Sequence, residues 1–382
     1  MKIGLISFHS FSEPGGVKTH ILSLAKEFEK RNIEFKIVVP RRKANENYGN
    51  KVILLGTSFP LHWGGGGSDL VFNFIPASIE GCFLKEKFTI LHFHNASFPS
   101  FFQILLSPVS FRTLNILTFH SDIERSGFFK KFPQFFDVFV GFCNLRLDGL
   151  IGVSKVALKY FEQFRKPKTV IPNGVDLQTF NPKNKKIQKF LDGKINLLFI
   201  GRIEERKGLI YLLKAFLILK KKYQNLRLIV GGEGPEKTNC EKFVKENNLK
   251  DVVFLGKVDK ELPLLYATCD IFCAPSIFGE SFGLVILEAM ASGKPVVGFA
   301  NEGYKELMKD KKGKNFLAKP KDFKELAKKI EILITNKKLR EEMGKWSEKE
   351  AKNYSWTKIA EKVLDFYKVC EKEKLKKKVT SF

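Results

Sequence analysis

Two glutamates lie eight residues apart in the segment GESFGLVILEAM, which spans residues 279–290. We expect Glu280 in the loop before a helix and Glu288 on the second turn of that helix, so that they face different parts of one ligand. Carboxylates accept hydrogen bonds from sugar hydroxyls, and the unpaired N–H groups near Phe282, Gly283 and Leu284 can hold phosphate. The alternative interpretation is that both glutamates are solvated residues at a helix terminus.

A second group is the cationic loop GRIEERKG at residues 201–208, which follows an apolar run. Arg202 offers a planar fork of donors and Lys207 a point charge, so the pair is suited to neutralising a diphosphate. Arg206 is interpreted as a solvated surface residue. In the alternative interpretation the whole set serves only solubility.

The first glycine-containing loop is SEPGGV at residues 12–17. Gly15 and Gly16 let the backbone approach a bulky anion, and the helix expected after them offers free N–H groups. A tight turn without a ligand is the alternative. The full GxGxxG spacing is missing, which disfavours a dinucleotide-dependent oxidoreductase.

These three motifs require elements that place them together, and the apolar pattern predicts two α/β domains. In the first, we expect strands at 2–8, 33–39, 52–55, 89–94, 114–120 and 149–153, with a helix at 17–30. In the second, we expect strands at 195–200, 226–230, 252–255, 271–274 and 295–299, and helices at 208–222, 236–247, 261–268 and 283–292. Ligands of doubly wound sheets bind outside the carboxyl ends of strands, where all three motifs lie.

Turn-forming residues mark the boundary between the domains. The segment IPNGVD at 171–176 is expected to be the hinge, which gives an N-terminal domain at 1–172 and a C-terminal domain at 173–355. Helices are expected at 321–335, 338–352 and 356–372, and the part from 356 to 382 is expected to cross back to the N-terminal domain. The basic tail at 372–378 is expected to be too charged to pack and therefore frayed.

Composition narrows the class of protein. The 382 residues include 66 Lys and Arg against 41 Asp and Glu, a net charge of +25, which favours nucleic acid, acidic lipid or nucleotide diphosphate as partners. The six cysteines show no CxxC pair, and Cys269 and Cys273 bracket an apolar run, so we expect core thiols in a reducing compartment. No apolar run approaches the ~20 residues of a membrane span, which predicts a soluble or peripheral protein.

Taken in order, the motifs resemble a known family. They are GGVKTH at 15–20, TFHS at 118–121, IGVS at 151–154, IPNGVD, the cationic loop, GGEGP at 231–235 and the two glutamates. This order is similar to that of the family-4 retaining glycosyltransferases (glycosyl transferase group 1). The resemblance implies the α/β GT-B fold, in which two doubly wound Rossmann-like domains face across a cleft and the C-terminus is helical. Around 91–94 and 118–120 the chain looks most like phosphatidylinositol mannosyltransferases, although Asn95 replaces their frequent acidic residue.

The resemblance also implies residue roles. The implied catalytic residues are Arg202, Lys207, Glu280 and His120. The implied donor-binding residues are Gly15, Gly16, Phe282, Gly283, Leu284 and Glu288. Glu288 would bind the ribose hydroxyls, while Glu280 and His120 would hold the transferred sugar; His120 alone is equally consistent with a hydrogen-bonded strand-end histidine. In the family, transfer with retention is thought to proceed by front-side attack, and Arg202 and Lys207 take the place of a metal, so no metal or other cofactor is expected.

The substrates follow from the same resemblance. GDP-mannose is the first choice of donor, followed by UDP-linked glucose, galactose or N-acetylglucosamine, and a lipid-linked acceptor in glycolipid or cell-envelope glycan synthesis is favoured over a soluble sugar or polysaccharide. The expected location is cytoplasmic, peripheral on the inner face of the plasma membrane. A sugar-nucleotide epimerase of the same architecture is a rival interpretation. A nucleic-acid-binding protein is another, but no DNA- or RNA-binding module is present and nucleic acid is not expected as a partner.

Two segments are candidates for contact with an anionic membrane. Phe128, Phe129, Lys130 and Lys131 open a stretch in which phenylalanines recur at helical spacing as far as Phe142, which predicts one apolar helix face. The second candidate is Trp63, which precedes the glycine run at 64–67. The alternative interpretation is that these aromatic residues pack the core of the domain.

Overall fold

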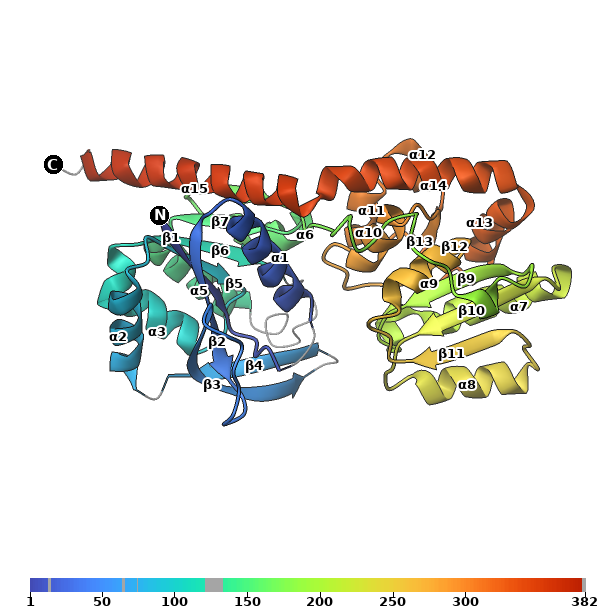
Figure 1. The fold of residues 1–382 in the computed structure, drawn as a ribbon, viewed down its shortest axis with the longest axis horizontal. Coiled ribbons are helices and arrows are strands. Elements are labelled where there is room, and N and C mark those ends of the chain that lie inside the picture. The colour runs from blue at the N-terminus through green and yellow to red at the C-terminus, as the bar shows by residue number, and fades with distance from the viewer. Residues whose placement is uncertain (13–14, 64–65, 74, 121–132, 380–382) are drawn as a thin grey trace. The chain divides into compact units, whose positions relative to one another are not determined.

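The structure is a computed structural model that describes residues 1–12, 15–63, 66–73, 75–120 and 133–379. The chain divides into two compact units (Figure 1). The N-terminal unit comprises Met1–Gly174 together with Trp356–Phe382, and the C-terminal unit comprises Val175–Ser355. Each unit has its own β-sheet and its own hydrophobic core.

The N-terminal unit is built on an eight-stranded sheet in the order β4-β3-β2-β1-β5-β6-β7-β8. The strands are β1 (Lys2–Ser7), β2 (Glu34–Arg41), β3 (Val52–Trp63), β4 (Gly66–Phe72), β5 (Ile90–His94), β6 (Leu114–Phe119), β7 (Gly149–Gly152) and β8 (Lys168–Val170). All neighbours pair in parallel except β3 and β4, which are antiparallel. The sequence predicted neither β4 nor the second half of β3. Asp69 explains the omission of β4, because this buried carboxylate is stabilised by distant partners: Arg42 Nη2 lies 2.5 Å from its Oδ1, and the Ser10 N–H donates to its Oδ2 at 3.1 Å.

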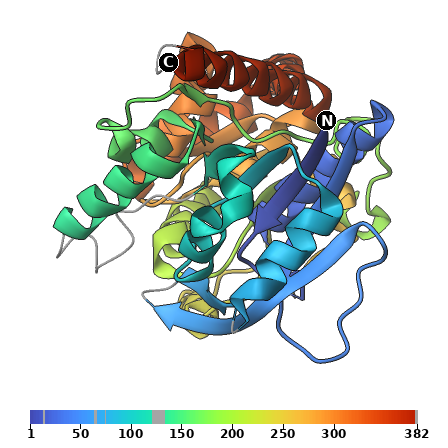
Figure 2. The same cartoon turned by 90° about the vertical axis from the view of Figure 1, so that its left-hand side faces the viewer.

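Helices cover both faces of this sheet, because parallel strands with apolar side chains on both faces must be buried on both sides. They are α1 (Gly16–Lys30), α2 (Pro76–Glu86), α3 (Ser100–Leu106), α5 (Pro133–Arg146), α6 (Lys155–Leu158) and α15 (Trp356–Val379), with 3-10 turns η1 (Pro108–Phe111) and η3 (Lys159–Phe161). The core on one face includes residues of α2, α3 and α5. The core on the other face includes residues of α1 and α15, which lie side by side (Figures 1 and 2).

The last helix, α15, is an integral part of the N-terminal unit. Ile359, Val363 and Cys370 are buried in the core that α15 shares with α1. The expectation of a frayed tail at 372–378 is wrong, because α15 continues as a helix to Val379. Its charge is accommodated by specific partners: Lys374 Nζ lies 2.7 Å from Asp148 Oδ2 and also donates to the Thr113 carbonyl at 2.6 Å.

The C-terminal unit is built on a six-stranded parallel sheet in the order β11-β10-β9-β12-β13-β14. The strands are β9 (Ile195–Ile200), β10 (Leu226–Gly231), β11 (Val252–Gly256), β12 (Ile271–Ala274), β13 (Val296–Phe299) and β14 (Leu317–Ala318). The helices are α7 (Leu209–Lys222), α8 (Lys237–Glu246), α9 (Leu262–Thr268), α10 (Leu284–Ala291), α11 (Glu302–Leu307), α12 (Lys311–Lys314), α13 (Phe323–Thr335) and α14 (Lys337–Ala351), with 3-10 turns η4 (Gln188–Phe190), η5 (Glu205–Lys207) and η6 (Lys352–Tyr354). The predicted strands and helices of this unit are therefore confirmed to within two residues at each end.

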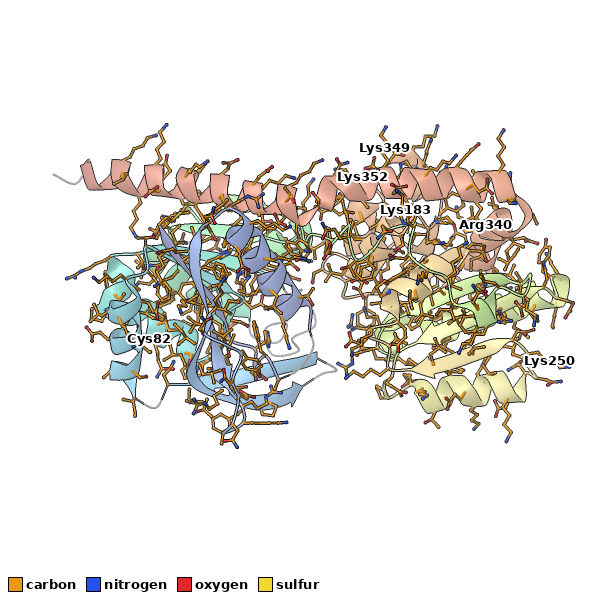
Figure 3. The ribbon with its side chains drawn as sticks, in the orientation of Figure 1. Cys82, Lys183, Lys250, Arg340, Lys349 and Lys352 are labelled. Carbon is orange, nitrogen blue, oxygen red and sulfur yellow. The ribbon has the colours of Figure 1, made fainter. Side chains whose placement is uncertain are left out.

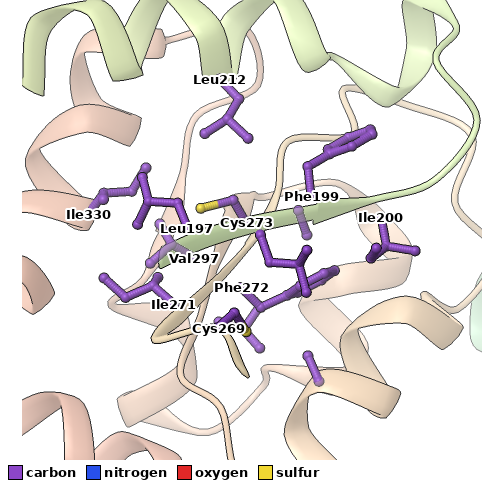
Figure 4. Packing of buried hydrophobic residues seen from close by; sticks show 14 of the residues in the cluster. Leu197, Phe199, Ile200, Leu212, Cys269, Ile271, Phe272, Cys273, Val297 and Ile330 are labelled. Atoms are coloured by element: carbon purple, nitrogen blue, oxygen red, sulfur yellow. The ribbon is translucent and has the colours of Figure 1, made fainter. Parts of the chain in front are cut away.

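The core of the C-terminal unit joins the sheet to its covering helices. Figure 4 shows Leu212 of α7 and Ile330 of α13 in the same buried cluster as Leu197 of β9. Cys269 and Cys273 lie in this cluster, so the expectation that they are core thiols is confirmed. Burial raises the pKa of Cys269 to about 12, which keeps the thiol protonated at neutral pH.

Much of the positive charge lies on solvated side chains. Lys250, Lys349 and Lys352 are exposed and extend from the surface of their helices or loops (Figure 3). Across the part of the chain that the structure describes, no helix combines the length and the hydrophobicity that crossing a membrane requires.

Candidate active site

A buried carboxylate with two cationic partners is the central feature of the C-terminal unit. Glu280, which is 9% exposed, precedes α10. Its Oε1 lies 2.5 Å from Lys207 Nζ and 3.1 Å from Arg206 Nη1. Arg206 also lies 2.5 Å from Glu204 through Nη2, so it links two buried carboxylates. The structure thus brings together Lys207 and Glu280, both predicted site residues.

The backbone of two loops builds this cluster. Gly208 ends η5 in the left-handed region with φ of 68°, and a Cβ there would lie 2.1 Å from the Pro275 carbonyl oxygen. The Ile277 N–H donates to the Arg206 carbonyl at 2.8 Å. The loop after β9 is therefore fixed against the loop after β12, and Glu280 follows in that second loop. Only glycine at position 208 permits this close approach.

The interpretation of Arg206 as a solvated surface residue is wrong. Its side chain is only 18% exposed, because Glu204 and Glu280 hold it on both sides. Arg202, by contrast, has a side chain that is 58% exposed and lies 3.9 Å from Glu204. Arg202 thus remains at the solvent edge of the loop, where it is accessible to an incoming anion.

Glu288 occupies a different environment from Glu280. It lies on the second turn of α10, and its Oε2 accepts a hydrogen bond from Tyr266 Oη at 2.9 Å. Burial raises the pKa of Glu288 to about 7, although the Tyr266 hydrogen bond acts in the opposite direction. The carboxyl group can therefore change its charge near neutral pH, unlike a solvated helix-terminal glutamate.

The start of α10 is held by packing. Gly283 has φ of 99°, and a Cβ there would lie 2.8 Å from the ring of Tyr304. The Phe282 side chain is 3% exposed and its ring lies 5.8 Å from that of Tyr354. Any contact of Phe282 with a ligand would therefore be through its backbone. The Ile286 N–H donates to the Gly283 carbonyl at 3.0 Å, which leaves the N–H groups of Leu284 and Val285 as the donors of the first turn that suit a phosphate.

His120 lies in the N-terminal unit, directly after β6. Its backbone N–H donates to Asn95 Oδ1 at 2.7 Å, and the Asn95 N–H donates to the Thr118 carbonyl at 2.8 Å. Asn95 itself has φ of 64°, a left-handed conformation that asparagine tolerates better than most residues. Asparagine, where the resemblance implies an acidic residue, therefore supplies the side-chain oxygen that positions His120.

His120 belongs to a cluster of histidines. Its Nε2 lies 3.2 Å from Nδ1 of His94, and the ring of His20 lies 4.7 Å from its own ring. His20, on α1, also pairs through Nδ1 with Asn173 Oδ1 at 2.8 Å. Burial lowers the pKa of His20 to about 4 and holds those of His94 and His120 well below the usual value, so all three imidazoles are neutral at pH 7.

His92 is the fourth histidine of this region and is held on both sides. Its Nε2 lies 2.6 Å from Thr118 Oγ1 and its Nδ1 lies 2.6 Å from Tyr367 Oη, which comes from α15. Sequence reasoning missed His20, His92 and His94 as neighbours of His120. The sequence could have indicated that His92 and His94 are neighbours, because they are two residues apart on one predicted strand and must share a face.

Gly15 and Gly16 lie at the start of α1, where Gly15 is the N-cap. Both are exposed, and a Cβ on Gly15 would meet no heavy atom within 4 Å. The α1 N-terminus is therefore accessible to a ligand, but no steric contact requires glycine at position 15.

The candidates for membrane contact are mostly outside the described residues. Phe128, Phe129, Lys130 and Lys131 are not described, and Trp63 ends β3 with a side chain that is not described either. The single apolar face expected as far as Phe142 is wrong at its end. Phe142 packs against Phe102 with ring centroids 4.8 Å apart, and Phe139 packs against Phe101 at 5.8 Å. The core-packing interpretation holds for these two residues.

Two parallel sheets of Rossmann type, with a helical C-terminus, are the architecture of GT-B glycosyltransferases. A glycosyltransferase from Rickettsia africae matches with a TM-score of 0.75 at 18% identity, covering 97% of this chain and 99% of that one. HepE of Anabaena, solved in complex with UDP-glucose, matches with a TM-score of 0.72 at 21% identity, covering 96% and 98%.

The sequence comparisons agree with this class. Residues 14–179 match the family model Glycosyltransferase Family 4, and residues 180–350 match Glycosyl transferases group 1. Over 375 residues the chain is 27% identical to the phosphatidyl-myo-inositol mannosyltransferase of Mycobacterium leprae, covering 96% of each. The chain belongs to the family-4, group 1 glycosyltransferases.

Proposed function

We propose that this glycosyltransferase moves mannose from GDP-mannose, with retention of configuration, to a lipid-linked acceptor of the phosphatidylinositol type. The observation that carries the proposal is the pairing of Glu280 with Lys207 and Arg206 beside the start of α10. This arrangement offers a sugar-binding carboxylate and phosphate-binding cations on one face of the C-terminal unit. The choice of mannose and of an inositol lipid is supported by the name of the Mycobacterium leprae relative.

On the donor side, Lys207 and the exposed Arg202 neutralise the diphosphate. The first turn of α10 adds backbone N–H groups, and Glu288 accepts hydrogen bonds from the ribose hydroxyls. The family resemblance also assigns Gly16 and His120 of the N-terminal unit to donor binding. Neutral His120 both donates and accepts hydrogen bonds, which suits it to a sugar hydroxyl.

The proposed reaction keeps the anomeric configuration. The acceptor hydroxyl oxygen bonds to the anomeric carbon on the face from which the diphosphate leaves, as the bond from that carbon to the diphosphate oxygen breaks. The acceptor proton passes to the leaving diphosphate. Lys207 and Arg202 stabilise the negative charge on that group, while Glu280 positions the sugar.

The acceptor is proposed to lie in an anionic membrane, with the enzyme attached from the cytoplasmic side. The net charge of +25 supports this attachment, because each basic residue near an anionic surface adds ~1 kcal/mol. On α5, the described part of the candidate segment, Phe135 is 54% exposed, Val138 72% and Leu145 77%. These side chains are available to the headgroup boundary.

The test combines a donor panel with an acceptor pair. Purified full-length protein is incubated with GDP-mannose or the UDP-linked sugars, and with phosphatidylinositol vesicles or soluble inositol phosphate. Mass spectrometry identifies the product. We expect a mannosylated lipid from GDP-mannose. Transfer only from a UDP-sugar would overturn the donor, transfer only to the soluble acceptor would overturn the lipid, and release of epimerised sugar without acceptor would indicate an epimerase.

Membrane attachment is tested separately by co-sedimentation with vesicles. We expect binding to anionic phosphatidylinositol vesicles at low salt, weakened as salt rises, and little binding to neutral vesicles. Equal, negligible binding to both kinds would contradict the attachment and favour a soluble sugar acceptor.

A further inference from the structure

The histidine cluster of the N-terminal unit has the dimensions of a metal site. One ring nitrogen each from His20, His94 and His120 can be chosen so that all lie within 4.8 Å of one another. Their ring centroids are 5.1, 4.7 and 5.4 Å apart. Three imidazoles on a tetrahedral zinc ion, with Zn–N distances of about 2.0 Å, place their centroids about 5 Å apart. The spacing of the three rings therefore matches that of three imidazoles on one ion.

The hydrogen bonding leaves ligand atoms available. Among the described residues, the buried Nε2 atoms of His20 and His94 have no hydrogen-bond partner, which is unfavourable unless something binds them. Asn173 Oδ1 is an acceptor, so Nδ1 of His20 carries the proton and donates at 2.8 Å. Nε2 of His20 then carries the lone pair. A carbonyl-type partner that fixes the tautomer in this way is typical of metal-binding histidines.

The neighbouring residues define the limits of the cluster. His92 is excluded as a ligand, because Thr118 and Tyr367 occupy both of its ring nitrogens. His120 is only partly buried, so an ion and a water ligand can approach from its side. Three protein ligands and one open position are the arrangement of many zinc sites that bind water or substrate.

We propose that His20, His94 and His120 bind a divalent first-row transition ion such as Zn²⁺, and that this ion inhibits transfer by withdrawing His120 from the sugar. His20 contributes Nε2, and His94 and His120 each contribute one ring nitrogen. If these are His94 Nδ1 and His120 Nε2, the ion replaces the hydrogen bond that joins the two atoms at 3.2 Å. An all-imidazole set selects Zn²⁺, Co²⁺, Ni²⁺ or Cu²⁺ over Mg²⁺ and Ca²⁺. Binding of the ion stands on the geometry alone, whereas the inhibition rests on the proposed function.

Binding is tested by titrating metal-free, full-length protein with Co²⁺, whose d–d absorption reports four- or five-coordinate nitrogen sites. The titration uses a Cys82→Ser background, because Cys82 is the partly exposed thiol among the six (Figure 3). We expect one equivalent of Co²⁺, displaced by Zn²⁺. His20→Gln and His94→Gln should each weaken Co²⁺ binding at least about tenfold, the scale of losing even an outer-shell partner.

Two further variants make the result specific. Asn173→Ala removes the hydrogen bond that fixes His20 and should weaken Co²⁺ binding about 10–100-fold. His9→Gln is the matched control: it removes a histidine of the same unit that lies outside the cluster, and should leave Co²⁺ affinity unchanged. Circular dichroism and thermal melting confirm that each variant is folded. Unchanged affinity in folded His20→Gln and His94→Gln, or no stoichiometric binding at all, would overturn the site.

The inhibition is measured in the transfer assay. We expect one equivalent of Zn²⁺ to abolish most of the transfer, EDTA to restore it, and His94→Gln to need at least about tenfold more Zn²⁺. Co²⁺ binding without inhibition would confirm the site and overturn the inhibitory role. Transfer by a protein that binds no Co²⁺ would overturn this inference and leave the proposed function standing.

Discussion

Lys207 Nζ lies 2.5 Å from Glu280 Oε1, although 73 residues separate the two in the chain. The lysine comes from the loop after β9 and the glutamate from the loop after β12, and these strands are neighbours in the sheet. Parallel pairing therefore converts two distant motifs into one charged centre. The contact also means that the Glu280 side chain is preorganised before any ligand arrives.

Lys207→Ala and Arg202→Ala should each lower turnover by about 10²–10³, the cost of removing one preorganised electrostatic donor. The fold should remain, because Glu280 keeps Arg206 as a partner. Steady-state kinetics with a matched thermal melt gives the answer. A folded double variant with near-normal turnover would remove both cations from the mechanism.

Arg206→Ala should lower the free energy of unfolding. It leaves Glu204 and Glu280 with one cationic partner fewer, and breaking a buried charge pair costs about 3–5 kcal/mol. Because Lys207 remains on Glu280, we expect a loss near the lower end of that range in urea unfolding. Lys250→Ala, an exposed lysine of the same unit, is the control and should change stability by less than about 0.5 kcal/mol. Equal stability of the two variants would contradict the role assigned to Arg206.

Glu288 should make stability depend on pH. Its folded pKa of about 7 lies above the ordinary glutamate value of 4.5, so the folded protein binds more protons than the unfolded chain between these values. Its contribution to stability is therefore present in full below pH 4.5 and is lost as pH rises through 7. Unfolding free energies of wild type minus Glu288→Gln, measured from pH 4.5 to 7.5, should fall with rising pH. A flat or rising difference would contradict the raised pKa.

Asn95 offers a test of how His120 is positioned. Asn95→Asp keeps the oxygen that accepts the His120 N–H and should retain most activity. Asn95→Ala loses that oxygen and its tolerance of positive φ, so it should cost about 1–3 kcal/mol of stability and reduce turnover. The measurement is turnover and urea unfolding of both variants. Equal loss in both would mean that the amide nitrogen, and not the oxygen, matters.

Transfer should survive excess EDTA and give an α-linked product from an α-linked donor. Lys207 and Arg202 supply the positive charge that a metal would otherwise bring to the diphosphate. Anomeric proton couplings in the NMR spectrum of the product report the configuration. Activity lost on chelation and restored by manganese, or a β-linked product, would contradict the mechanism.

The strands and helices were largely predictable because each depends on a short apolar pattern. Buried parallel strands such as Ile195–Ile200 are nearly continuous apolar runs, and this pattern can be recognised from the local sequence alone. Strand β4 was not predictable, since Asp69 looks like a loop residue until Arg42 is known to face it. The tail of α15 was mispredicted for the same reason, because Lys374 finds Asp148 far along the chain.

The sequence identified several residues of the candidate site, but it did not predict which of them contact one another. The glutamates and Lys207 lie in motifs that can be read from the sequence. The burial of Arg206 depends on Glu280, 74 positions away, and no local pattern reports it. The histidine cluster combines α1, β5 and the loop after β6, and only the strand order places these beside one another.

The docking of α15 has a consequence for synthesis on the ribosome. Helix α15 completes the core of a unit whose first strand begins at Lys2, through Ile359, Val363 and Cys370. Its Tyr367 also forms a hydrogen bond with His92. The first 174 residues therefore emerge from the exit tunnel with one sheet face covered by α1 but not by α15. The rest of that face stays exposed until the C-terminal unit has been translated and α15 has left the exit tunnel. A nascent chain stalled before residue 356 would thus present an exposed apolar surface to chaperones.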